Sequence, residues 1–165
     1  MAKSILVLSD SHGNSRNVKK ILELCPDADM IVHLGDGACD FTKFLPDNYD
    51  KPFVVIEGNG EYYGWVDADR RYRPKRTETI EFEGKKIFMT HGHLYDVKYG
   101  LERIAARAYA DGADIVLFGH THEPFNSYKD GVYYFNPGSI REGFYGVIDI
   151  TEKGIMCLNK NLVSY

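Results

Sequence analysis

The sequence predicts an α/β protein in which two mixed β-sheets pack together and helices cover the outside. Five short apolar runs, rich in β-branched and aromatic residues, have the length of strands buried on both faces. Helical patterns separate several of these runs, and hairpin signals appear in the later part of the chain. Parallel βαβ units combined with antiparallel strands indicate a sandwich of two sheets.

The apolar runs and the patterns between them place the βαβ units. Strands are predicted at residues 5–8, 30–32, 53–56, 87–89 and 115–118. Apolar residues recur at helical spacing in the first and last gaps, at Val18, Ile21, Leu22 and Cys25 and at Leu101, Ile104, Ala105 and Ala108. Asn14 or Ser15 is suited to cap the first helix, and Gly112 to end the last. A shorter helix is expected around Phe41, Phe44 and Leu45, where Pro46 would stop it.

Antiparallel strands are predicted in the later part of the chain. They are expected at residues 77–82, 125–128, 132–135, 144–150 and 155–158, with turns at Glu83-Gly84, Asp130-Gly131 and Lys153-Gly154. A long loop is expected from Gly60 to about Arg76. It contains five basic residues and three aromatic ones, which favour either a solvated loop or a local attraction for polyanions: Arg70, Arg71, Arg73, Lys75 and Arg76, and Tyr62, Tyr63 and Trp65.

Composition limits the classes of protein that the chain can belong to. Its 165 residues, 44% hydrophobic and 27% charged, predict one domain over residues 1–165. No apolar run approaches the roughly 18 residues of a membrane span, and no secretory signal pattern is present, so we expect a cytoplasmic protein. The net charge of −4 gives no general attraction to nucleic acid. Cys25, Cys39 and Cys157 lack metal or disulfide spacing and are expected to be buried apolar residues.

Polar residues follow every one of the five apolar runs. The runs end in Asp10 and His12, in Asp36, in Asn59, in His91 and His93, and in His120 and His122. Ligands of open α/β sheets bind beyond the carboxyl ends of the strands, so these tips are predicted to form one polar cluster. Each tip alone is also explained by an ordinary turn, helix cap or surface histidine. Five tips at the same end of successive strands favour a common site.

The residue types in this cluster indicate a metal site. Imidazole, carboxylate and amide oxygen without thiolate suit Mn, Fe, Zn, Co or Ni. Seven ligands with one shared carboxylate suffice for two ions, the arrangement used by phosphatases and nucleases. A dinucleotide-binding loop at 35–40 is a weaker interpretation, because Asp40 replaces the third glycine and the segment follows the second strand.

The ordered set of motifs resembles the calcineurin-like metallophosphoesterases. The residues are Asp10-x-His12, Gly35-Asp36, Gly58-Asn59, His91-Gly92 and Gly119-His120-Thr121-His122. The His91–Tyr95 stretch and Asn136-Pro137-Gly138-Ser139 are similar to those of the compact single-domain YfcE-type phosphodiesterases. The resemblance implies a four-layer αββα sandwich with a two-metal site, Mn being the first choice and Ni, Fe, Zn or Co the others.

The resemblance also implies a role for each motif residue. Asp10, His12 and His122 would bind the first ion and Asn59, His91 and His120 the second, with Asp36 bridging. The implied reaction is in-line attack on phosphorus by a metal-bridging hydroxide. Gly60-Glu61 replaces the family's His or Cys followed by an acidic residue, so good leaving groups should be favoured.

The remaining candidates have individual interpretations. His93 is a candidate for phosphate contact or for support of the ligands, and it joins Asp36 and Asn59 in the expected catalytic set. His33 is more simply a buried histidine bonded to backbone than a ligand. Ser11, Ser15 and Arg16 are candidates for substrate contact.

The sequence therefore predicts a metal-dependent phosphodiesterase or phosphatase that acts on a small phosphoester. A protein-interaction module of the same fold is the first alternative, and the histidines count against it. A nuclease is the second, and the acidic balance counts against it. Nucleic-acid and membrane partners are not expected. The sequence itself does not show the oligomeric state, and the resemblance to small members of the family implies a homodimer or larger homo-oligomer.

Overall fold

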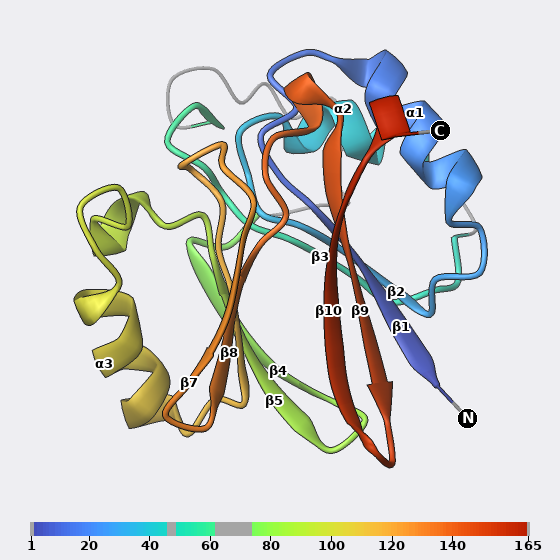
Figure 1. Ribbon diagram of the computed structural model, residues 1–165. Helices are drawn as coiled ribbons and strands as arrows, with labels where there is room; N and C mark the ends of the chain where they lie inside the picture. Colours follow the sequence, from blue (N-terminus) through green and yellow to red (C-terminus); the bar gives the residue numbers. More distant parts are fainter. Residues whose placement is uncertain (1, 46–48, 62–73, 165) are drawn as a thin grey trace.

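The computed structural model describes residues 2–45, 49–61 and 74–164, which form two five-stranded mixed sheets packed against each other (Figure 1). The first sheet has the order β10-β9-β1-β2-β3, with β1 (Lys3–Leu8), β2 (Met30–His33), β3 (Phe53–Val55), β9 (Phe144–Thr151) and β10 (Gly154–Asn161). The second has the order β4-β5-β6-β8-β7, with β4 (Thr77–Phe82), β5 (Lys85–Thr90), β6 (Ile115–Leu117), β7 (Phe125–Lys129) and β8 (Val132–Asn136).

Each sheet has three parallel strands, and antiparallel strands complete it. β1, β2 and β3 are parallel, as are β5, β6 and β8, while β9, β10, β4 and β7 pair antiparallel to their neighbours. The parallel strands of one sheet thus end at one edge, which is where the polar tips of the sequence lie. The predicted mixture of parallel and antiparallel strands is confirmed.

Alternation along the strands divides the core into three layers. On β1, Ile5 and Val7 face the second sheet, where they pack with residues such as Ile87 and Ile115. Leu6 faces outward and packs with residues of the first helix. A third cluster packs Phe88 and other outward residues of the second sheet against the last helix. The continuous apolar runs are needed because both faces of these strands are buried.

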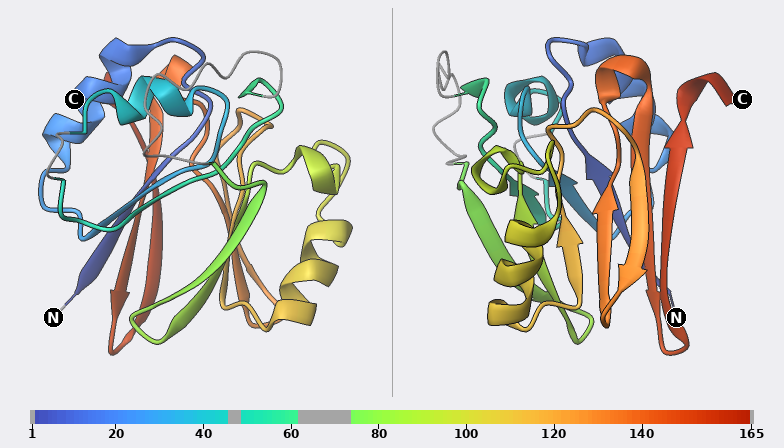
Figure 2. Two further views of the ribbon diagram at one scale, coloured as in Figure 1. Left: turned by 180° about the vertical axis from the view of Figure 1, so that it is seen from behind. Right: turned by 60° about the vertical axis from the view of Figure 1, so that its left-hand side comes forward.

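Helices cover both outer faces, as Figure 2 shows from two further directions. α1 (Ser15–Leu24) and α2 (Ala38–Thr42) lie on the first sheet, and α3 (Glu102–Asp111) lies on the second. Short 3-10 helices in the described ranges, η2 (His93–Tyr95), η3 (Ile140–Glu142) and η4 (Leu162–Ser164), lie in connections and near the C-terminus. The expected four-layer αββα sandwich is confirmed. No helix in the described ranges has the length and hydropathy to cross a bilayer.

Local signals of the sequence agree with the element ends. The Asn14 side chain accepts the N–H of Asn17 and caps α1, and Gly112 ends α3 in the left-handed conformation. The turns at Glu83-Gly84 and Asp130-Gly131 connect hairpins through left-handed residues, while the last hairpin turns one residue earlier than expected, before Gly154.

Two further expectations about the fold are wrong. The short helix lies at Ala38–Thr42, before Phe44 and Leu45, because it starts directly after the left-handed Gly37. Of the three cysteines, only Cys157 is buried, while Cys25 is half-buried and Cys39 is exposed. Pro46, the predicted end of the short helix, and the 62–73 segment of the predicted basic and aromatic loop lie outside the described residues.

Candidate metal centre

The tips of five parallel strands from the two sheets meet at one place. The seven residues that the sequence predicts as ligands follow β1, β2, β3, β5 and β6: Asp10, His12, Asp36, Asn59, His91, His120 and His122. Their side chains are linked by the short distances given below. The structure therefore brings all seven predicted residues into one cluster.

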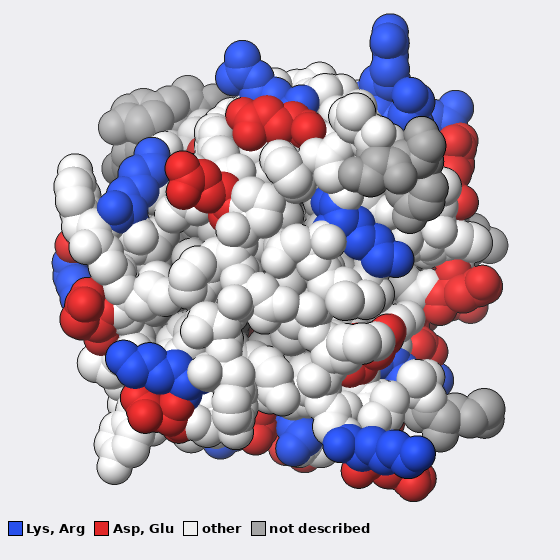
Figure 3. Space-filling model, viewed as in Figure 1, with Lys and Arg blue, Asp and Glu red and all other residues white. Residues whose placement is uncertain are grey.

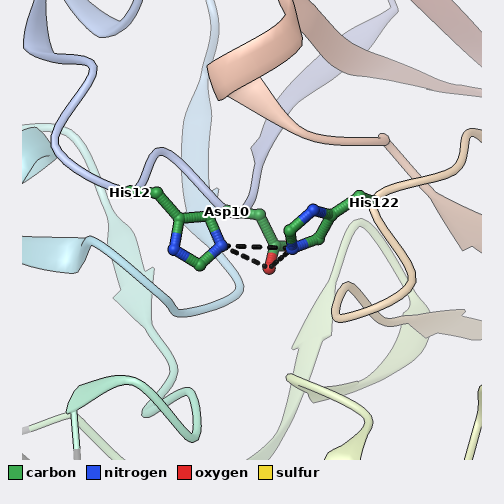
Figure 4. A group of neighbouring side chains, drawn as sticks. All are labelled: Asp10, His12 and His122. Atoms are coloured by element: carbon green, nitrogen blue, oxygen red, sulfur yellow. Dashed lines mark hydrogen bonds and ion pairs between the residues drawn. The ribbon is translucent and has the colours of Figure 1, made fainter.

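The first group consists of Asp10, His12 and His122 (Figure 4). Nε2 of His12 and Nε2 of His122 are 3.1 Å apart, and they lie 3.6 Å and 3.2 Å from Oδ1 of Asp10. Asp10 comes from the end of β1 and His122 from the loop after β6, so the group joins the two sheets. Three ligand atoms of suitable type converge on one point.

The second group lies beside the first and shares Asp10 with it. Nε2 of His91 is 3.4 Å from Oδ2 of Asp36, 3.9 Å from Oδ1 of Asp10 and 3.1 Å from Oδ1 of Asn59. The rings of His91 and His120 have centroids 5.0 Å apart. Oδ2 of Asp36 also lies 3.8 Å from Nε2 of His12, which places this oxygen between the two groups.

Hydrogen bonds fix the direction of the ligand atoms. Nδ1 of His91 is 2.8 Å from the carbonyl oxygen of Leu34, which can only accept, so Nδ1 carries a proton and Nε2 is turned to the cluster. Oδ2 of Asp10 accepts the Ser9 hydroxyl at 2.5 Å and the N–H of His120 at 3.1 Å. Oδ1 of Asp10 is buried and accepts no well-aligned hydrogen bond from the described residues. A buried carboxylate oxygen left in this way, among imidazoles, fits a metal ligand.

The electrostatics of the cluster favour ionised carboxylates. Burial would raise the pKa of Asp10, but interactions with His12, His122, His91 and Ser9 outweigh it and hold the pKa well below its usual range. The pKa of His91 is raised, because Asp36 and Asp10 outweigh its burial. Burial and the neighbouring positive charges of His91 and Lys98 lower the pKa of His120 to about 4.

The backbone at this site is strained. Eight described non-glycine residues have a positive φ, and five of them are predicted ligands: Asp10, His12, Asp36, His120 and His122. Two of the other three, Glu83 and Asp130, lie in hairpin turns, where this conformation is usual. Strained residues persist where the surrounding structure holds them, and they cluster at functional sites.

Comparison with known proteins agrees with this geometry. The profile of the calcineurin-like phosphoesterase superfamily domain matches residues 4–153. The chain belongs to this superfamily. It is 31% identical over 139 residues to the probable metallophosphoesterase YsnB of Bacillus subtilis, covering 84% of this chain and 75% of that protein.

Two further relatives cover more of the chain. Phosphodiesterase YfcE of Escherichia coli K12 is 27% identical over 176 aligned positions, covering 94% of this chain and 92% of that protein. The crystal structure of a predicted phosphoesterase from Streptococcus pneumoniae TIGR4 has a TM-score of 0.75 at 25% identity, covering 98% of this chain and 90% of that one. The chain is thus a phosphoesterase domain of the metal-dependent type.

Glu61 holds together two of the metal-site loops of this phosphoesterase, a role that sequence reasoning missed. Glu61 is 7% exposed, and its carboxylate accepts four backbone N–H groups. Those of Asp36 and Gly58 donate to Oε2 at 2.8 and 2.6 Å, and those of Gly37 and Ala38 donate to Oε1 at 2.5 and 2.9 Å. The only signal in the sequence is an acidic residue two positions after a predicted ligand.

Asp40 performs a similar task for the loop after β1. Its Oδ2 accepts the N–H of Gly13 at 2.7 Å and the hydroxyl of Ser11 at 2.8 Å, and Oδ1 accepts the hydroxyl of Ser15 at 3.2 Å. Ser11 is fully buried, so its predicted substrate contact is wrong. Ser15 is engaged by Asp40, and Arg16 is exposed on α1.

Asn136 and Ser139 also hold loops that carry the proposed ligands. The Asn136 amide donates to the carbonyl of Gly119 and to the hydroxyl of Thr121, both at 3.0 Å. The Ser139 hydroxyl donates to the carbonyl of Asp10 at 2.8 Å. The Asn-Pro-Gly-Ser segment therefore supports the ligand loops.

The structure gives His93 and His33 different surroundings. The centroid of the His93 ring lies 5.4 Å from that of His91 and 6.1 Å from that of His120. Its Nδ1 is buried without a hydrogen-bond partner among the described residues. His33 is fully buried, and its Nδ1 accepts the N–H of Gly35 at 3.2 Å. The expectation of a buried, backbone-bonded His33 is confirmed.

Proposed function

We propose that this phosphoesterase hydrolyses a small phosphodiester at the cluster of seven strand-tip residues, with two divalent metal ions, preferably Mn. The observation that carries the proposal is the convergence of these residues into one cluster, in which five of them have a strained backbone with positive φ. The name of YfcE, a phosphodiesterase similar over nearly the whole chain, supports a diester as substrate.

The proposed ligands divide into two sets that share a carboxylate. Asp10, His12 and His122 would hold one ion, and Asn59, His91 and His120 the other, with Asp36 between them. When bound, divalent ions supply positive charge for the phosphoryl oxygens and lower the pKa of water. Ni, Fe, Zn and Co are alternatives that the same donor types accept.

Cationic side chains near the cluster would attract and orient the phosphate. Positive charges of Arg141, Lys98 and Arg76 act on His12, His120 and His93 respectively, so each lies near the cluster. This local charge offsets a net charge of −4. A protein with a negative net charge needs such local positive charge to attract an anionic substrate.

His93 is proposed to contact the phosphoryl group or its leaving oxygen. Its ring flanks two proposed ligands, and its buried Nδ1 is free of hydrogen bonds to the described residues. Gly60 has no side chain to protonate a leaving group, and its N–H donates to Oδ1 of Asp36 at 2.6 Å. Asp36 and Asn59 complete the proposed catalytic set.

A small substrate is preferred to a nucleic acid. On the face shown in Figure 3, basic side chains lie singly or in a small group at the upper right, among acidic ones, and form no continuous basic stripe. The free cysteines are consistent with a reducing compartment such as the cytoplasm, which we propose as the location. We propose no protein partner beyond further copies of the chain.

The test is hydrolysis of bis(p-nitrophenyl) phosphate and p-nitrophenyl phosphate by EDTA-treated protein, with Mn, Ni, Zn, Fe and Mg restored separately. Metal-dependent diester cleavage that is lost in His122→Ala would support the proposal. A folded protein without activity toward either ester, with any ion, would contradict it and favour a protein-interaction module.

A further inference from the structure

A cavity lies between the segment that joins η2 to α3 and the segment that runs from the end of β6 to the start of β7. It has a volume of about 450 Å³, within the range of roughly 300–1,000 Å³ that is usual for small-molecule sites. Five of its lining residues are apolar: Val97, Leu101, Phe118, Pro124 and Phe125. The polar ones are Lys98, Thr121 and Glu123.

The cavity adjoins the metal centre through the loop after β6. Thr121, which lines it, stands between the proposed ligands His120 and His122. Lys98, also in the lining, is close enough for its charge to act on His120. On the other side, Val97 packs against Gly92, the residue after His91: a Cβ on Gly92 would be 2.6 Å from a Val97 methyl carbon.

The lining suits an apolar group better than a sugar. Phe118 and Phe125 have ring centroids 6.0 Å apart at an interplanar angle of 53°. Phe118 is only 2% exposed and lies at the base of the cavity, whereas Phe125 is 38% exposed, so its ring is the one available to stack with a further ring. The Thr121 hydroxyl is already bonded to the Asn136 amide and to the backbone of Glu123. Among the described lining residues only two side chains, Lys98 and Glu123, therefore keep polar groups for the hydroxyls of a ligand.

We propose that this cavity binds an aromatic or similarly flat apolar ester group of the phosphodiester whose phosphate lies at the metal centre. The inference rests on the proposed function and extends it to a substrate class. Lys98 lies in both the cavity lining and the surroundings of His120, where it would meet the negative charge of the phosphate. The exposed ring of Phe125 would contact the ester group.

Titration calorimetry of the Mn-loaded chain with phenylphosphonate and methylphosphonate tests this inference without requiring turnover. Both probes present the same anion, so a difference in Kd reports the phenyl group. We expect phenylphosphonate to bind about tenfold more tightly, as partial burial of a ring would provide. Phe125→Ala should remove most of that difference while leaving methylphosphonate binding unchanged. Tyr128→Ala, an exposed aromatic on the same strand outside the lining, should preserve it.

Equal Kd values for the two phosphonates in the wild type would overturn the cavity assignment. So would a preference that Phe125→Ala leaves intact. Bis(p-nitrophenyl) phosphate hydrolysis is measured on the same preparation. Cleavage of that diester without a phenyl preference removes only the cavity inference, whereas failure to cleave it removes the proposed function.

Discussion

The carboxylate of Glu61 accepts the backbone N–H of Asp36 at 2.8 Å, so a residue after β3 fixes a loop after β2. The same carboxylate binds the N–H of Gly58 at 2.6 Å. Asp36 and Asn59 are thereby held at the spacing seen in the cluster. Because the carboxylate is buried and satisfied by four donors, substitution affects both loops at once.

Glu61→Gln should weaken Mn binding by about 10- to 100-fold, the usual effect of removing support from metal ligands. An amide nitrogen cannot accept hydrogen bonds, so part of the donor set loses its partner. Titration calorimetry and kcat measure the effect, and a thermal melt checks folding. Glu57→Gln, a half-buried acidic residue next to the same loop, is the control and should bind Mn normally. Equal affinities in both variants would refute the role given to Glu61.

Asp36→Asn should reduce kcat more than Asn59→Ala. Oδ2 of Asp36 lies between the two groups, 3.4 Å from His91 and 3.8 Å from His12, so loss of its charge affects both proposed ions. Asn59 belongs to one set only. Steady-state kinetics with saturating Mn measure the difference. Small and equal losses in the two variants would argue against a shared carboxylate.

Acidification should destabilise the metal-free protein through His33. Burial lowers the pKa of His33 from 6.5 to about 4, so between these values the unfolded chain binds a proton that the native state does not. Stability is therefore lost as the pH falls, by about 2 kcal/mol between about pH 7 and about pH 5. His33→Asn retains an acceptor for Gly35. Urea unfolding at both pH values should show a loss smaller by this amount in the variant; parallel losses would disprove the assignment.

An aryl phosphodiester should be cleaved faster than an alkyl one. Gly60 offers no side chain as a proton donor, so the rate should depend on how readily the alcohol leaves. Bis(p-nitrophenyl) phosphate and a dialkyl phosphate compared at equal Mn concentration provide the measurement. Comparable kcat values would mean that another group protonates the leaving oxygen, and His93 is the first candidate. In that case His93→Gln would abolish alkyl cleavage selectively.

Gly35→Ala should destabilise the protein more than Gly13→Ala. Both glycines have positive φ, so both variants carry the backbone penalty of about 1 kcal/mol. A Cβ at Gly35 would also lie 2.5 Å from the nitrogen of Gly58, whereas one at Gly13 meets nothing within 4 Å. The crowding should add about 1–3 kcal/mol. Chemical denaturation measures both variants, and equal losses would contradict the close approach of the two loops.

The sequence by itself determined the strands, the helix ends and the residues that meet at the site, because these features depend on residues close together in the chain. Continuous apolar runs such as residues 5–8 predicted buried strands, and Asn14 and Gly112 predicted helix ends, because strand burial and capping depend on nearby residues. The polar tips also predicted which residues meet, since parallel strands end at one edge of a sheet.

Only the tertiary structure decided which side chains hold the ligand-bearing loops at the strand ends in place. Glu61 and Asp40 act through backbone N–H groups of loops that lie more than twenty residues away, and a backbone donor leaves no mark in the sequence. The order of the strands and the apolar cavity lined by Phe125 and Thr121 likewise depend on which segments pack together. Residue types predicted the chemistry of the site, whereas the contacts between distant loops determined its geometry.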